Sequence, residues 1–140
     1  MGKQVRVFDL LTKKQSINVF KSQKIKNEIA EKLRVATLYE KQLQEILNSM
    51  VGADNNKTAA EIKSENWYKL KIQDELVANR NKIDFLSKEI ISQRMQVAKE
   101  SEKLKKFNEK KDHYKKMEIQ EKERRQDGIM PSRIEKGFKL

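Results

Sequence analysis

The residues that most often do chemistry in proteins are sparse in this chain. Of 140 residues one is histidine, His113, and none is cysteine. His113 stands in a run of lysines, which is typical of a solvated helix surface. Zinc sites need several Cys or His ligands at short spacing, and the sequence contains no such group. We therefore expect no metal site, no thiolate nucleophile and no catalytic histidine.

The sequence also contains no motif for a phosphate-binding loop and no carboxylate expected to have a shifted pKa. The four glycines are isolated from one another, so no glycine-rich loop forms a phosphate cradle. Asp and Glu are abundant, but on long helices they face water, where nothing desolvates them for acid–base catalysis. The sequence thus predicts that the protein is not an enzyme and needs no cofactor.

The elements that carry these residues are predicted to be long helices. Pro131 is the single proline, and the one glycine away from the chain ends is Gly52. Charged residues make up 38% of the chain and aromatic residues 6%, too little apolar material for a globular core. The composition predicts an all-α fold in which helices pack along a narrow seam, meaning the line of residues that face the neighbouring helix.

The first helix is predicted over residues 4–51. With Phe8 as an a position, the a and d positions of successive heptads are largely apolar at both ends and polar in the middle. These positions are Phe8, Leu11, Gln15, Asn18, Ser22, Ile25, Ile29, Lys32, Ala36, Tyr39, Leu43, Ile46 and Met50.

Residues 52–57 form the one segment rich in turn residues. Gly, Asp and Asn there favour a turn. Thr58 and Glu61 follow with the spacing of a capping box, so a second helix is predicted over 58–126. Gly128 is expected to cap that helix and Pro131 to prevent its continuation, which leaves 127–140 as a flexible tail. The whole chain is interpreted as one coiled-coil domain.

A second seam follows the second helix. Its apolar positions are Ile62, Ile72, Leu76, Ile83, Leu86, Ile90, Val97, Leu104, Phe107 and Tyr114, interrupted by Glu65, Lys69, Asn79, Gln93 and Glu100. The short turn predicts an antiparallel coiled-coil hairpin. Centring it on Asp54 pairs Ile25 with Ile83, Leu11 with Val97, and Ala36 with Ile72. The second helix then extends about 20 residues, or roughly 30 Å, beyond the first, and leaves Phe107 and Tyr114 without partners.

Some large apolar residues lie off this seam. Trp67, Leu70, Val77 and Ile91 occupy another side of the second helix. A stripe of this kind favours a docking face for a partner, because exposed apolar stripes promote aggregation unless something covers them. The competing interpretation has Trp67 folding back to cap the hairpin near residues 52–57.

The net charge of the chain suggests nucleic acid, an anionic lipid or an acidic protein as partner, but the distribution of the charges argues against nucleic acid. The net charge is +11, from 32 Lys and Arg against 21 Asp and Glu. Acidic residues alternate with basic ones, whereas tracking of a phosphate backbone favours a face of one sign. No apolar run is long enough for a membrane span.

Three segments resemble a known family. The opening Val5-Arg6-Val7-Phe8-Asp9-Leu10-Leu11 with Lys13-Lys14-Gln15, the mid-chain Trp67-Tyr68, and the charged block from Leu104 to Arg125 are similar to FliJ, the flagellar type III export protein, and to its YscO-type injectisome counterparts. The resemblance covers nearly the full length. The chain departs from the family at Asp127-Gly128 and Pro131.

The resemblance implies a non-enzymatic central stalk in a type III protein export apparatus. FliJ-type proteins are antiparallel coiled coils that insert into the hexameric export ATPase and bind the cytoplasmic domain of the export gate, and they are linked to export chaperones. The resemblance also implies a cytoplasmic location, peripheral to the inner-membrane export gate. A generic basic coiled-coil adaptor, or a coiled coil associated with nucleic acid, is the alternative.

The two candidate contact sets follow from this interpretation. The end inserted in the ATPase ring is expected to contain Phe8, Leu11, Val97, Leu104, Phe107 and Tyr114. The off-seam residues Trp67, Leu70, Val77 and Ile91 are expected to contact the export gate or a chaperone. The second assignment rests on the apolar stripe and not on a family motif.

Overall fold

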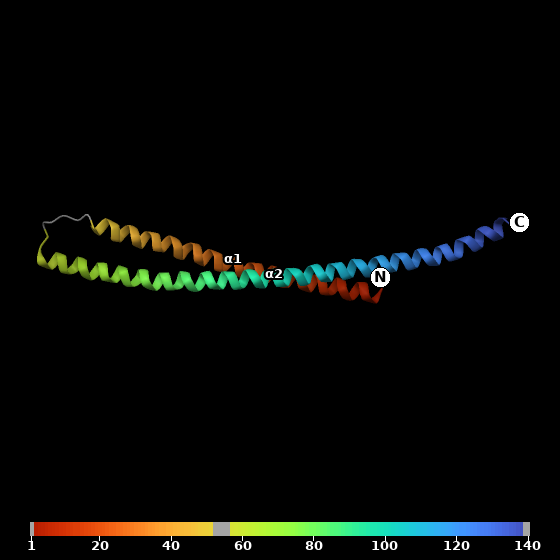
Figure 1. Cartoon of the computed structure of the whole chain (residues 1–140), viewed down its shortest axis with the longest axis horizontal. Coiled ribbons are helices and arrows are strands. Elements are labelled where there is room, and N and C mark those ends of the chain that lie inside the picture. The colour runs from red at the N-terminus through yellow and green to blue at the C-terminus, as the bar shows by residue number, and fades with distance from the viewer. Residues whose placement is uncertain (1, 52–56, 139–140) are drawn as a thin grey trace. The chain divides into compact units, whose positions relative to one another are not determined.

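Two helices make up the chain. The structure is a computed structural model that describes residues 2–51 and 57–138, with side chains for 2–50 and 57–128. Helix α1 (Lys3–Val51) and helix α2 (Ala59–Phe138) run antiparallel, and no strand occurs in the described ranges (Figure 1). The predicted all-α two-helix hairpin is confirmed.

The chain divides into two compact units, and both helices contribute to each. Unit 1 consists of Met1–Lys21 and Val97–Leu140, and unit 2 consists of Ser22–Gln96. Within each unit a segment of α1 packs against a segment of α2. The expectation of one coiled-coil domain over the whole chain stays a prediction.

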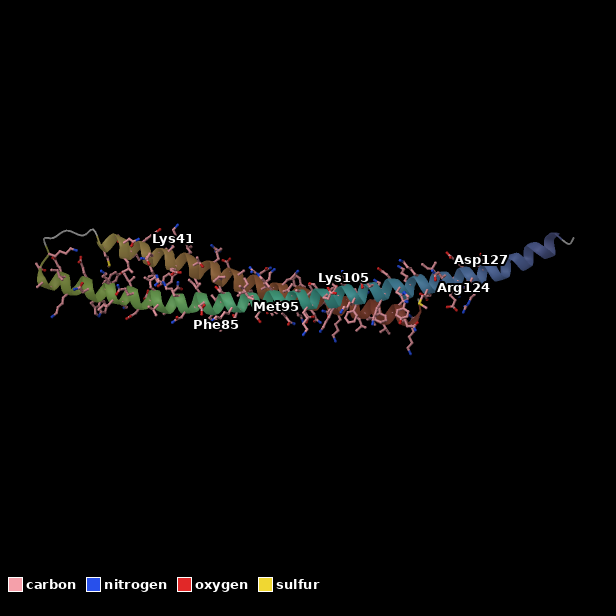
Figure 2. The ribbon with its side chains drawn as sticks, in the orientation of Figure 1. Lys41, Phe85, Met95, Lys105, Arg124 and Asp127 are labelled. Carbon is pink, nitrogen blue, oxygen red and sulfur yellow. The ribbon has the colours of Figure 1, made fainter. Side chains whose placement is uncertain are left out.

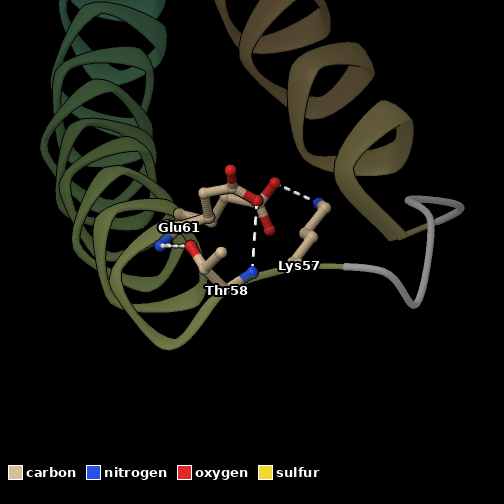
Figure 3. A network of polar contacts seen from close by, with 4 residues as sticks. Lys57, Thr58 and Glu61 are labelled. Carbon is tan, nitrogen blue, oxygen red and sulfur yellow. Dashed lines mark hydrogen bonds and ion pairs between the residues drawn. The ribbon is translucent and has the colours of Figure 1, made fainter.

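Helix α2 begins with the predicted capping box (Figure 3). The Glu61 backbone N–H donates to the Thr58 hydroxyl at 3.2 Å, and the Thr58 N–H donates to the Glu61 carboxylate at 3.3 Å. These bonds satisfy two backbone donors that the first turn of a helix leaves unpaired. An ion pair from Lys57 to Glu65 lies beside the box. Residues 52–56 of the predicted turn lie outside the described residues.

The end of α2 differs from the prediction. The helix continues through Gly128 and Pro131 to Phe138 instead of ending near residue 126, so most of the predicted tail is helical. No described glycine has a positive φ, so Gly128 does not act as a left-handed cap. Glycine adopts helical angles as well as left-handed ones, and one proline removes a single hydrogen bond of the helix.

The core of unit 2 lies near the loop end of the helices. Leu43 and Leu47 of α1 pack with Ile72 and Leu76 of α2, and Met50 covers the cluster. The second buried row of α1 here is shifted by one residue from the predicted row, because Leu47 is buried whereas Ile46 is 39% exposed. The predicted seam residues Ile25, Lys32, Tyr39 and Ile46 of α1 are therefore exposed, and Ile62 of α2 is exposed as well.

The pairing of the two helices in unit 2 corrects the predicted register. The Asn79 amide donates to the Ala36 carbonyl oxygen at 2.8 Å, and the Gln93 amide donates to the carbonyl and hydroxyl oxygens of Ser22, both at 3.0 Å. Ala36 thus faces Asn79, seven residues along α2 from its predicted partner Ile72. The pairs centred on Asp54 are wrong by one heptad.

Unit 1 shows the same correction. The Gln15 amide donates to the Glu100 carbonyl oxygen at 2.8 Å and to its carboxylate at 2.5 Å. Further along, Gly2 lies so close to Glu118 that an added Cβ would stand 2.9 Å from the carboxylate. The part of α2 beyond α1 therefore begins near Glu118 rather than at residue 105, and it runs to Phe138.

Heptad spacing alone does not separate the two registers. A shift of seven residues leaves every apolar row in phase. The buried polar residues do separate them, since the predicted register places Asn79 against Ile29 and Ser22 against Leu86. In the observed register these polar groups are hydrogen-bonded, and no described buried side-chain polar atom lacks a partner. Within the described residues, neither helix contains an apolar stretch able to cross a bilayer.

Candidate functional site

The residues predicted to enter an ATPase ring all fall in unit 1. Each is partly buried between the α1 and α2 segments of that unit. The set is Phe8, Leu11, Val97, Leu104, Phe107 and Tyr114. Phe107 and Tyr114 were predicted to lack intrachain partners, and the register correction places them alongside α1 instead.

An aromatic contact joins the helices in unit 1. The rings of Phe8 and Tyr114 are stacked with centroids 5.3 Å apart and an interplanar angle of 13°. The Lys110 ammonium lies 5.7 Å from the Phe8 centroid, and the His113 ring meets the edge of Tyr114 at 5.5 Å. Cation–π and stacking contacts of this kind stabilise a partly exposed interface. His113 thus packs against Tyr114.

Asp9 connects two lysines in the same unit. Its carboxylate lies 3.1 Å from Lys13 on its own helix and 3.2 Å from Lys111 on α2. The hydrogen bond from Lys13, and then the one from Lys111, lowers the pKa of Asp9 below its ordinary value of 3.8. Asp9 is therefore charged at neutral pH and fastens the first turns of α1 to α2.

The basic charge of the chain is concentrated in unit 1. Its residues include 19 Lys and Arg against 10 Asp and Glu, a net charge of +9, whereas unit 2 has 13 against 11, a net charge of +2. Lys103, Lys106 and Lys110 line one shallow hollow around Phe107. A basic surface with an apolar centre is suited to an acidic partner.

The predicted docking residues lie on one exposed side of α2 in unit 2. Trp67, Leu70, Val77 and Ile91 are 58–61% exposed. Sequence reasoning missed two further members, Phe85 at 60% and Met95 at 69%, which Figure 2 labels on α2. We call these six residues the exposed face of α2. Heptad spacing from Trp67 leads to Met95, so the sequence contained a signal for that residue.

Trp67 stands exposed on α2 beside Lys71. Its ring is 61% exposed, and the ammonium of Lys71 lies 5.1 Å from the ring centroid. The alternative in which Trp67 caps the hairpin near residues 52–57 involves residues 52–56, which lie outside the described residues, so it stays a prediction. A large ring held only by an exposed lysine remains accessible to a partner.

Sequence reasoning also missed Val5, which is 2% exposed and the most buried side chain of unit 1. Val5 shares a hollow with Lys115 and Ile119 of α2. The predicted seam began at Phe8, and its pattern places residue 4, not Val5, at the preceding d position. Val5 lies six heptads before Leu47, on the same row shifted by one residue.

The described residues contain no cluster of candidate metal ligands. No group of three or more His, Asp or Glu side chains in that part of the chain is placed to hold a metal ion. Comparisons with protein-family models, curated proteins and solved structures found no significant match.

Proposed function

We propose that the protein is a non-enzymatic stalk of a type III protein export apparatus, inserting into a hexameric export ATPase and connecting it to the export gate. The proposal combines the FliJ-type resemblance with one structural observation. All six residues expected at the ring lie in a single interhelical seam of unit 1, where the positive charge is also concentrated.

Two features of unit 1 support this role. A stalk needs a stiff helical end, and the stacked Phe8–Tyr114 pair with the Asp9–Lys111 ion pair fastens α1 to α2 close to the N-terminus. A stalk also needs a segment that reaches past the hairpin, and α2 runs beyond Glu118 to Phe138. On this proposal α2 leads into the ring and the α1–α2 pair follows.

The experiment measures ATP hydrolysis by the cognate hexameric ATPase with and without the purified chain. We expect stimulation at stoichiometric amounts. The variant Leu104→Asp with Phe107→Asp should abolish it, because two buried charges disfavour the seam. Both residues are partly buried within unit 1, however, so this variant also loosens the helix pair itself.

A surface variant separates contact from folding. Lys103 and Lys106 are exposed, so Lys103→Glu with Lys106→Glu leaves the seam intact and should still reduce stimulation at least tenfold. The matched control is Lys63→Glu with Lys82→Glu, which makes the same change of charge on exposed sites of unit 2. Equal loss in both variants would show a general charge effect and contradict insertion through unit 1.

The charge of unit 1 also favours one alternative, association with nucleic acid. That alternative predicts binding to a DNA or RNA duplex that weakens steeply with salt and no stimulation of an ATPase. Measuring duplex binding between 50 and 200 mM salt, roughly the range over which such binding collapses, distinguishes the two functions.

A further inference from the structure

The exposed face of α2 is nearly self-complementary about Asn81. Starting from Trp67, every seventh residue lies on the central line of this face: Trp67, Asp74, Asn81, Lys88 and Met95. All five are exposed and belong to unit 2. Such a row is unusual on the solvent side of a helix, because it places the largest apolar residues at its two ends and opposite charges inside them.

We propose that this face pairs with the same face of a second copy, so that the free protein forms an antiparallel homodimer with its two-fold axis at Asn81. Antiparallel pairing about Asn81 places Trp67 of one copy against Met95 of the other and Asp74 against Lys88. The proposal goes beyond the stalk function, which needs no self-association.

Charge and shape select this orientation over the parallel one. In a parallel pair Asp74 would face Asp74 and Lys88 would face Lys88, and like charges directly opposite one another destabilise helix pairs. In the antiparallel pair both contacts are attractive. Lys88 already lies 3.1 Å from Asp84 on its own helix, with both side chains more than two-thirds exposed, so its ammonium is available to a second carboxylate.

One pair of flanking apolar positions agrees with the same axis. Val77 and Phe85 stand four residues on either side of Asn81, and both are exposed, at 58% and 60%. Antiparallel pairing brings Val77 of one copy to Phe85 of the other. At the centre Asn81 meets Asn81, and an amide pair at such a position is a known way to fix the register of paired helices.

The contact involves one helix from each copy over about 28 residues, or roughly 42 Å. An interface of that size falls at the small end of specific interfaces, below about 1,200 Å². We therefore expect a reversible dimer whose population depends on concentration, with the termini of the chain in unit 1 free for other partners.

Sedimentation equilibrium of the full chain over a range of concentrations tests the proposal. The wild-type protein should dimerise reversibly. Asp74→Lys and Lys88→Asp should each weaken dimerisation about tenfold, since each turns two attractive pairs per dimer into repulsive ones. The double variant Asp74→Lys with Lys88→Asp should return to within about twofold of wild type, because the pairs are attractive again.

Matched controls make the same charge changes off the face. Glu89→Lys and Lys82→Asp alter exposed residues on another side of α2 and should leave dimerisation unchanged. A second control compares Trp67→Ala, which should weaken the dimer at least tenfold, with its neighbour Tyr68→Ala, which should not. A protein that stays monomeric at every concentration, or a charge swap that fails to restore pairing, would overturn the proposal without touching the stalk function.

Distances between spin labels report the orientation directly. The chain contains no cysteine, so single cysteines at 82 or 68 carry one label per copy. Antiparallel pairing predicts a short distance at 82, under roughly 25 Å, because this residue stands next to the axis. At 68 it predicts about 40 Å, since the two labels are offset by about 26 residues along the helices. Short distances at both positions would establish a parallel pair and contradict the proposed axis.

Discussion

At the residue scale, the buried polar side chains decide how the helices align. Gln15, Ser22 and Asn79 are 5–7% exposed, at positions where a helical seam is usually apolar. Each is hydrogen-bonded across the helix pair in the observed register. Separating a buried polar group from its hydrogen-bond partner costs much more free energy than exchanging one apolar contact for another. These residues therefore specify register more than they add stability.

A substitution at Asn79 tests this role. We expect Asn79→Leu to keep or raise the melting temperature, because an apolar side chain fills the same buried site. The variant should populate two registers. In the register shifted by one heptad, the variant buries one unsatisfied polar group fewer than the parent does, so that register becomes more accessible. Labels on cysteines at the exposed sites 32 and 82, measured by pulsed electron paramagnetic resonance, should give one distance in the parent and a second, longer population in the variant, because a shift by one heptad moves the two sites apart by about 10 Å along the helix axis. A single unchanged distance in the variant would show that residues other than Asn79 determine the register of the two helices.

Asp9 gives a prediction about pH. Its two lysine contacts lower its pKa below 3.8, so its stabilising effect is present at neutral pH and is lost as the pH falls through that lowered value. Carboxyl chemical shifts of Asp9, followed by NMR from pH 6 to 2, roughly the range in which carboxyl groups titrate, should report a midpoint below 3.8. In Lys111→Ala the midpoint should rise. An unchanged midpoint would mean that the contact across the helices does not persist in solution.

At the element scale, sequence reasoning succeeded where the signal is local. The capping box at Thr58 and Glu61 is confirmed because both bonds form within one turn. The two helices follow from long stretches without breaking residues. Register failed because periodicity of seven is the same in every heptad, and the distinguishing contacts, such as Gln15 with Glu100, join residues 85 apart. Ser22 and Gln93 are polar residues at seam positions, and pairing them with each other would have predicted the observed register.

The seam of α2 allows a matched pair of truncations. Leu76 is 4% exposed and belongs to the core cluster, whereas its neighbour Val77 is 58% exposed. Leu76→Ala should destabilise the fold by about 2–4 kcal/mol, because it leaves a cavity between the helices. Val77→Ala should change stability by less than about 0.5 kcal/mol. Chemical denaturation followed by circular dichroism measures the free energy of unfolding of both variants. Equal losses of stability would contradict the orientation of α2, in which Leu76 faces α1 and Val77 faces solvent.

At the scale of the whole molecule, the excess positive charge and the exposed face of α2 belong to different units. Unit 1 carries most of the excess positive charge, and unit 2 carries the exposed face of α2. This separation is suited to a protein with two partners. The residues expected to contact the ATPase ring are half-buried in the seam of unit 1. The sequence does not distinguish an apolar residue that packs in a seam from one that binds a partner. The assignment of these residues as ring contacts therefore comes from the family resemblance.

A double truncation tests the exposed face as a docking surface for the export gate or a chaperone. Trp67→Ala with Leu70→Ala should leave the melting temperature nearly unchanged, since both side chains are about 60% exposed. Binding to the export gate or a chaperone, measured by calorimetry on the same preparation, should weaken by more than about 2 kcal/mol. A lower melting temperature with intact binding would assign both residues to folding. If the same face also pairs two copies, the partner and the second copy should compete.

The long separation between paired residues in unit 1 has a consequence for synthesis on the ribosome. Gln15 finds Glu100 only after 85 further residues have been added, whereas Ala36 finds Asn79 after 43. At about 5–20 residues per second, the N-terminal segment waits several seconds longer than the middle of α1 for its partner. Unit 2 is therefore expected to assemble first, while the nascent N-terminus, with Val5 and Phe8 still uncovered, is open to chaperones and proteases.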